Sequence, residues 1–275
     1  MRRILPPLLL LLLLSSGLAA QEVDAGALLR RSSKNEVAAL EHPDPFRFKE
    51  RTEQSSGSET RDVIETSQGR ADRIIAFQDK PLAGDQNEKQ NRRLQKLLTS
   101  SDALRDEMKD QQEETRRRLR MAAALPNAIL LQFAGTEQDG QLRFTFTPNP
   151  AFSPHDRESQ IYRGMRGTVW IDPVHERLTH VKGELFKDVT FGWGILGKLN
   201  KGGHYEAEQT QVAPGVWKMT LLDVDFRGSV FFFGRIRIQR KETSADFAPS
   251  PPDLTIQAAI KQLMAKYPLK ATSSQ

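Results

Sequence analysis

The sequence predicts a mainly β protein with helices, an α+β fold built on antiparallel strands. Short runs of alternating apolar and polar residues, separated by turn residues, fill residues 43–83 and 126–247. A charged helical stretch at 84–125 interrupts them. Some later strands are apolar on both faces, which requires either a second packed layer or a ligand cavity.

Residues 1–20 have the pattern of a secretory signal peptide, because Arg2 and Arg3 precede an uncharged apolar run and small residues follow it. The run is too short to span a bilayer, so we expect cleavage near Ala20 and export of the mature chain. No other stretch has the length and hydropathy of a stable membrane span.

Composition excludes several classes of protein. The chain has no cysteine, which excludes disulfides, thiolate chemistry and lipidation on a cysteine. Its 40 basic and 35 acidic side chains are close to balance, the more so once Arg2 and Arg3 are removed, so nothing favours nucleic acid as a partner.

Residues 21–42 predict one or two short helices that Pro43 ends. An antiparallel meander follows, in which Phe46 and Phe48 share one face of the first strand. Pro81 ends the meander.

Residues 84–125 predict two helices with a thin apolar stripe, broken at residues 99–102 by a new N-cap and ended by Pro126. Two interpretations remain open for this segment. It is either a solvated charged insertion or a movable lid over a cavity.

The strands expected after Pro126 are bounded by turn residues, including a turn at Arg227-Gly228. Their ranges are 129–134, 142–147, 167–172, 176–185, 203–211, 216–226 and 229–241. Residues 248–275 predict a proline-rich linker, 248–252, and then an amphipathic helix, 254–267, that Asp253 caps and that docks on the sheet.

The segment 188–205 matches two nucleotide-binding spacings, G-x-G-x-x-G and most of a phosphate loop. Both interpretations fail, because Leu199 stands where a phosphate loop needs Ser or Thr and the segment lies within an antiparallel series. We therefore expect neither a nucleotide nor another cofactor, and we assign the glycines to backbone mobility.

No constellation of residues predicts an enzyme. The five histidines show no metal-binding spacing, so no metal is expected. Ser229 lies outside a nucleophile elbow, and Asp223 and Asp225 share a strand face without other signs of a sugar cleft.

Several motifs resemble the outer-membrane lipoprotein-sorting family of diderm bacteria, the LolA/LolB-like fold, and more closely an exported branch of it. The motifs are GTVWIDP at 167–173, FGWG at 191–194, Gly202-Gly203, GVW at 215–217 and the closing strand 230–239. The resemblance covers residues 43–247, with the helical insertion 84–125 inside that domain.

The resemblance implies an unclosed antiparallel barrel, with helices over its concave apolar face, that accepts acyl chains of lipids or lipoproteins in the periplasm. Because no cysteine is available for lipidation, the chain is more similar to the soluble carrier, which we expect to be a monomer. An envelope module that binds protein partners through residues 84–125 is the alternative, and a secreted hydrolase a remote one.

For the carrier, we predict an apolar cavity lined by aromatic and aliphatic residues and a headgroup contact with two lysines. The cavity residues are Trp170, Phe191, Trp193, Leu196, Trp217, Phe226, Phe231 and Phe233, and the lysines are Lys198 and Lys201.

Overall fold

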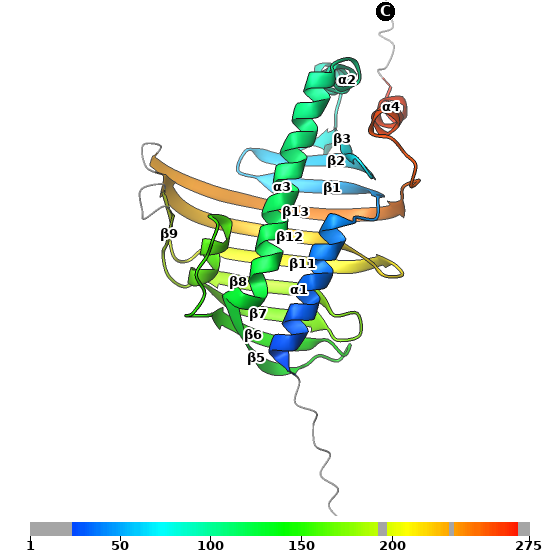
Figure 1. Ribbon diagram of the computed structural model, residues 1–275. Coiled ribbons are helices and arrows are strands. Elements are labelled where there is room, and N and C mark those ends of the chain that lie inside the picture. Colours follow the sequence, from blue (N-terminus) through cyan, green and yellow to red (C-terminus); the bar gives the residue numbers. More distant parts are fainter. Residues whose placement is uncertain (1–23, 192–196, 231–233, 269–275) are drawn as a thin grey trace, which may run out of the picture.

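One large antiparallel sheet organises the chain. The structure, a computed structural model, describes residues 24–191, 197–230 and 234–268, so the predicted signal peptide lies outside the described residues. The main path of the sheet runs β4-β3-β2-β1-β13-β12-β11-β8-β7-β6-β5, and β9 and β10 join it through β12 (Figure 1). The sheet is not closed, which confirms the α+β class and the unclosed antiparallel architecture.

The strands and helices of the described residues have the following bounds. The strands are β1 Phe46–Gln54, β2 Gly57–Thr66, β3 Gly69–Phe77, β4 Lys80–Pro81, β5 Ile129–Thr136, β6 Leu142–Pro148, β7 Met165–Asp172, β8 Arg177–Leu185, β9 Val189–Phe191, β10 Gly197–Leu199, β11 His204–Ala213, β12 Val216–Val230 and β13 Gly234–Pro249. The helices are α1 Ala25–Glu41, α2 Gly84–Thr99, α3 Ser101–Ala128, a 3₁₀ helix η1 Glu158–Gly164 that the sequence pattern did not predict, and α4 Ile256–Lys266.

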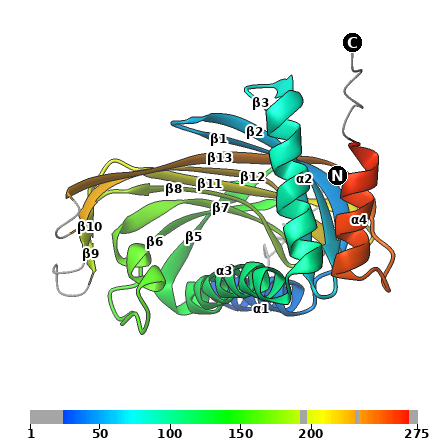
Figure 2. The same ribbon diagram turned by 90° about the horizontal axis from the view of Figure 1, so that it is seen from above.

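The sheet is curved, and α1 and α3 run side by side across one of its faces (Figures 1 and 2). At one end α3 contacts β3, and at the other it contacts β5. The helices α2 and α4 pack against each other and against the β2–β3 end of the sheet. Among the described residues, none of the helices is both long and apolar enough to cross a membrane.

Within the described residues, three separate apolar clusters hold the elements together, and the smallest packs Phe46 and Phe48 of β1 against Val63 of β2. The main core packs Leu28 and Leu29 of α1 against inward residues of β6, β7 and β8, among them Phe144 and Val169. The second core lies at the other end, where α2 and α4 meet β2 and β3; its buried members are Ile64, Ala71, Leu94, Leu97, Ile256, Ala259, Ile260 and Leu263. Each core follows the period of its elements, with alternate residues buried in strands and every third or fourth in helices.

The insertion divides into two helices, and Ser100 caps the second by accepting a hydrogen bond from the Ala103 backbone N–H. The prediction that Pro126 ends the helix is wrong, because α3 continues to Ala128. Proline has no N–H for the Ala122 carbonyl one turn earlier. The hydroxyl of Ser33 on α1 donates to that carbonyl instead, at 2.6 Å, which satisfies the group within the helix pair.

The predicted turn at Arg227-Gly228 is also wrong, because β12 runs unbroken from Val216 to Val230. Gly228 has a packing role instead. A Cβ at this position would lie 2.2 Å from the carbonyl oxygen of Lys198 on β10, which pairs with β12 here. Only glycine permits that approach.

The C-terminal region differs from its prediction in two boundaries. The strand β13 extends to Pro249 and pairs there with Phe46, so the first two residues of the expected linker are strand. The helix α4 begins at Ile256, and Thr255, not Asp253, provides its cap by accepting a hydrogen bond from Ala258.

Candidate functional site

Two of the predicted cavity residues meet in the main core. Phe191 of β9 and Phe226 of β12 are both buried and belong to the same apolar cluster. The Arg157 guanidinium lies 5.6 Å from the centre of the Phe191 ring. These two aromatic residues define the apolar end of the sheet, where β9 and β10 fold against β12.

The two described tryptophans of the predicted set lie elsewhere. Trp170 alternates with the buried Val169 and Ile171, so it points to the opposite face of β7, where its ring stacks on His180 at 4.5 Å. Trp217 contacts His175 edge to face, with ring centroids 5.6 Å apart. The other predicted cavity residues, Trp193, Leu196, Phe231 and Phe233, lie outside the described residues.

The predicted headgroup lysines are grouped around Asp188. The Lys198 ammonium lies 3.1 Å from the Asp188 carboxylate, and the Lys201 backbone N–H donates to the same carboxylate at 2.8 Å. The backbone hydrogen bond from Lys201 lowers the pKa of Asp188 most, and the Lys198 ammonium lowers it further. An anionic headgroup would therefore compete with Asp188 for Lys198.

Backbone mobility is the expected role of the glycines of residues 188–205. In the structure, the glycines around the β9–β10 hairpin also have packing and turn roles. Gly202 has φ +92°, a left-handed turn conformation that favours glycine. A Cβ on Gly203 would lie 2.3 Å from the Phe226 ring, and one on Gly197 would lie 2.8 Å from the carbonyl oxygen of Ser229. Their mobility stays a prediction, but close packing is sufficient to explain why glycine stands at Gly197 and Gly203.

The helix α3 packs on β3 and β5 near its ends, and little of its length is buried against the sheet. Of the 28 residues of α3, only Ala128 is buried. Ile238 of β13 is paired with Phe226 and therefore shares its face, yet it is 47% exposed. Val224, on the same face two residues from Phe226, is half-buried. An apolar strip thus continues along this face of β12 and reaches solvent at Ile238, whereas β13 places the charged Arg240 opposite Val224.

The apolar strip ends beneath α1, at a buried cluster of polar side chains. The Arg177 guanidinium lies 3.3 Å from the Glu36 carboxylate and donates to the Asn35 carbonyl oxygen at 2.7 Å. Gln209 donates to Glu36 at 2.9 Å. Burial raises the pKa of Glu36, and Arg177 opposes that effect. Burial also raises the pKa of the nearby Tyr205 phenol.

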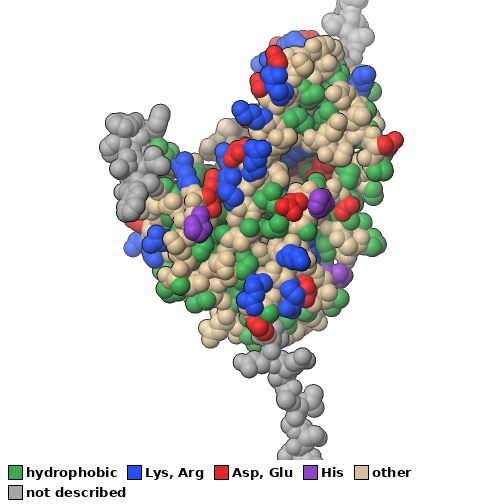
Figure 3. Space-filling view, viewed as in Figure 1, with side chains coloured by type: hydrophobic (Ala, Val, Ile, Leu, Met, Phe, Trp, Pro, Cys, Tyr) green, Lys and Arg blue, Asp and Glu red, His purple; other side chains and the backbone are tan. Residues whose placement is uncertain are grey.

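The exposed side of α3 is charged. Glu113 pairs with Arg116, Arg117 and Arg120, and the last two also approach Glu158 of η1. Figure 3 shows basic and acidic side chains interspersed over the helix-bearing face. These ion pairs are largely solvated, so each contributes little to stability.

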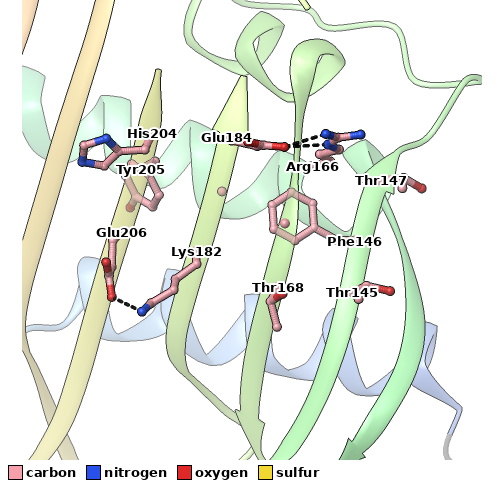
Figure 4. Close-up of a pocket in the computed structure, with 12 residues that line it drawn as sticks. Thr145, Phe146, Thr147, Arg166, Thr168, Lys182, Glu184, His204, Tyr205 and Glu206 are labelled. Atoms are coloured by element: carbon pink, nitrogen blue, oxygen red, sulfur yellow. Dashed lines mark hydrogen bonds and ion pairs between the residues drawn. The ribbon is translucent and has the colours of Figure 1, made fainter. Parts of the chain in front are cut away.

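A groove of about 530 Å³ lies on the face opposite α1, over β6, β7, β8 and β11. Gly167 and Gly183 are paired at its floor. Phe146 and Tyr205 lie on the strands to either side (Figure 4). The residues that line it are Thr145, Phe146, Thr147, Arg166, Gly167, Thr168, Lys182, Gly183, Glu184, His204, Tyr205 and Glu206. The ion pairs Arg166–Glu184 and Lys182–Glu206 bound this apolar floor, an arrangement suited to a small ligand with an apolar body and polar ends.

The groove was missed in the sequence because its residues become neighbours only through strand pairing. The paired glycines were the available signal, since glycine within a strand marks a close approach. A Cβ on Gly167 would lie 1.9 Å from the Lys182 carbonyl oxygen.

The fold and sites define an α+β protein with an open antiparallel sheet, a helix layer and an apolar strip at one end. No protein-family model, no curated protein and no solved structure matches the chain.

Proposed function

We propose that the protein is an exported carrier that holds an acyl chain of a lipid or lipoprotein, without catalysis, against the inner face of its open sheet. In this proposal α1 and α3 cover the concave apolar face, and the chain lies between α3 and strands β12 and β13. The observation that carries the proposal is the apolar strip that remains uncovered there, with Ile238 at 47% exposure beside the buried Phe226.

Burial of acyl methylenes supplies enough energy for reversible binding. Each methylene contributes about 0.8 kcal/mol when it leaves water, so part of one chain is sufficient. The charged pair of Arg177 and Glu36 sets the limit of the acyl site, because an alkyl chain would leave these groups desolvated without a new partner. The chain would then extend toward β9 and β10.

The sequence supports the same proposal through its resemblance to the periplasmic lipoprotein carriers, which spans residues 43–247. Export is proposed from the signal pattern of residues 1–20. N-terminal sequencing of the secreted protein should give Gln21 as its first residue.

The proposal predicts that Ile238→Glu lowers the affinity for cis-parinaric acid, a fluorescent fatty acid, at least tenfold. A carboxylate beside Phe226 would have to be desolvated when the chain binds. Titration of the purified protein and displacement by palmitate provide the measurement.

Val174→Glu is the matched control, since Val174 is 82% exposed in the turn between β7 and β8, away from the strip. It should bind the probe as the parent does. Failure of the parent to bind the probe saturably, or equal affinities of the parent and Ile238→Glu, would overturn the proposal.

A further inference from the structure

Three potential metal ligands converge on the face of the sheet opposite α1. His180 lies on β8, and Glu206 and Glu208 lie two residues apart on the neighbouring β11. Glu208 is directly opposite His180 in the pairing, so the side chains project to the same side. Val181 and Ala207, which alternate with them, pack toward the core instead.

The ligand atoms are close enough to share one ion. His180 Nε2 lies 2.9 Å from one Glu206 oxygen and 3.5 Å from one Glu208 oxygen, and all three ligand atoms lie within 4.8 Å of one another. The side chains of His180 and Glu206 are 21% and 25% exposed, which shields the cluster but leaves access from solvent. An ion between these atoms would replace the imidazole–carboxylate contacts with coordination bonds.

A second feature holds the imidazole in place. The Trp170 indole stacks on the His180 ring at 4.5 Å and 18°, and its Nε1–H donates to Glu137 at 3.1 Å. The stacked ring has little freedom to rotate away from the carboxylates.

We propose that His180, Glu206 and Glu208 bind a divalent transition-metal ion, with Zn²⁺ as the best match. One imidazole nitrogen with two carboxylate oxygens suits zinc, whereas calcium and magnesium favour oxygen ligands alone. Three protein ligands leave coordination positions for water. Glu206 also lines the groove over Gly167 and Gly183, so the ion would lie at the end of that groove.

Lys182 opposes metal binding, because its ammonium lies 2.9 Å from the same Glu206 oxygen that approaches His180. The ion and the ammonium compete for this carboxylate. The proposal therefore predicts that Lys182→Met raises zinc affinity several-fold. If these residues formed only a cross-strand ion-pair network and no metal site, Lys182→Met would not raise zinc affinity.

The test is calorimetric titration of the full chain, without a polyhistidine tag and after chelator treatment, with ZnCl₂. One equivalent should bind saturably, and His180→Ala, Glu206→Gln and Glu208→Gln should each lower the affinity at least tenfold. His155→Ala is the matched control, because His155 is exposed between β6 and η1 and belongs neither to the groove lining nor to the three-ligand group. It should bind as the parent does.

Tryptophan fluorescence adds an independent readout. Zinc should change the emission of the parent, and Trp170→Phe should abolish that change while zinc still binds. Circular dichroism confirms that each variant is folded. The proposal is overturned by absent zinc binding in the parent, by parent-like affinity in His180→Ala, or by an emission change that persists in Trp170→Phe.

Discussion

At the scale of single residues, Asp72 shows how a buried charge is tolerated at the β3 end of the sheet. Its carboxylate is 4% exposed and contacts Arg61 of β2 at 2.8 Å and Arg93 of α2 at 3.3 Å. Burial acts to raise the pKa of Asp72, but Arg93, Arg61 and Arg70 together lower it below the usual 3.8. The carboxylate thus joins a helix to two strands.

We predict that Asp72→Asn lowers the free energy of unfolding at pH 7 by about 2–3 kcal/mol, since Arg61 and Arg93 lose the buried carboxylate that they share and keep only their more exposed partners, Glu59 and Glu107. Because the folded-state pKa is lowered, this contribution is present above the unfolded-state pKa. It is lost as the pH falls through the lower folded-state value. The difference between the parent and the variant should be constant from pH 7 to about pH 5 and shrink below about pH 4.

Urea unfolding at several pH values measures this difference. Asp246→Asn is the control, because Asp246 is 64% exposed in its pair with Lys49 and the change should cost less than about 0.5 kcal/mol. A pH-independent difference for Asp72→Asn would contradict the electrostatic account.

At the scale of elements, the glycine of β12 decides whether the β9–β10 hairpin can attach. Gly228→Ala would place a Cβ 2.2 Å from the Lys198 carbonyl oxygen, so β10 must move away. Leu199 and Phe191 would then leave the main core. We expect a loss of about 1–3 kcal/mol in the free energy of unfolding.

Hydrogen exchange should show faster exchange at 189–191 and 197–199 in this variant than in the parent. Gly26→Ala is the control, because Gly26 lies in α1 and its nearest neighbour would be the flexible end of Arg30 at 3.4 Å. It should be neutral or stabilising by up to about 1 kcal/mol. Unchanged exchange in Gly228→Ala would rule out this role for the glycine.

The elements that the sequence predicted well are those whose pattern is local. The first strand, Phe46–Gln54, and the break before the cap at Ser100 depend on alternation and on capping chemistry within a few residues. The errors at Pro126 and Gly228 have a common cause. Proline and glycine usually end a helix or a strand. Here a contact with another element, the Ser33 hydroxyl in one case and the Lys198 backbone in the other, lets the helix or strand continue through them.

The same distinction applies to the candidate sites. Trp170 alternates along β7 with the apolar residues Val169 and Ile171, which are buried in the core. This local alternation already places Trp170 on the opposite face of the strand, so it argues against Trp170 as a residue of a cavity in the core. The position of Trp217 depends on register shifts in the pairing of β11 with β12, which no local pattern reveals. The cluster around His180 depends on β8 pairing with β11, past two intervening strands.

At the scale of the whole molecule, the two larger of the three apolar clusters are separate, and α3 contacts the sheet near both. Through most of its length α3 is exposed or half-buried, so its packing couples the stability of one core only weakly to that of the other. The two ends should therefore differ in their resistance to local unfolding.

Ile260→Asp tests this division. Ile260 is 1% exposed in the core of α2, α4, β2 and β3, so a carboxylate there loses apolar burial and must be desolvated, at a cost of about 3–5 kcal/mol. We expect amide protection to fall in these four elements and to persist in β6, β7 and β8, where Phe144 is fully buried. The exposed Lys261, converted to Asp, is the control and should leave both ends protected. Equal loss of protection at both ends in Ile260→Asp would mean that the sheet itself couples the cores into a single cooperative unit.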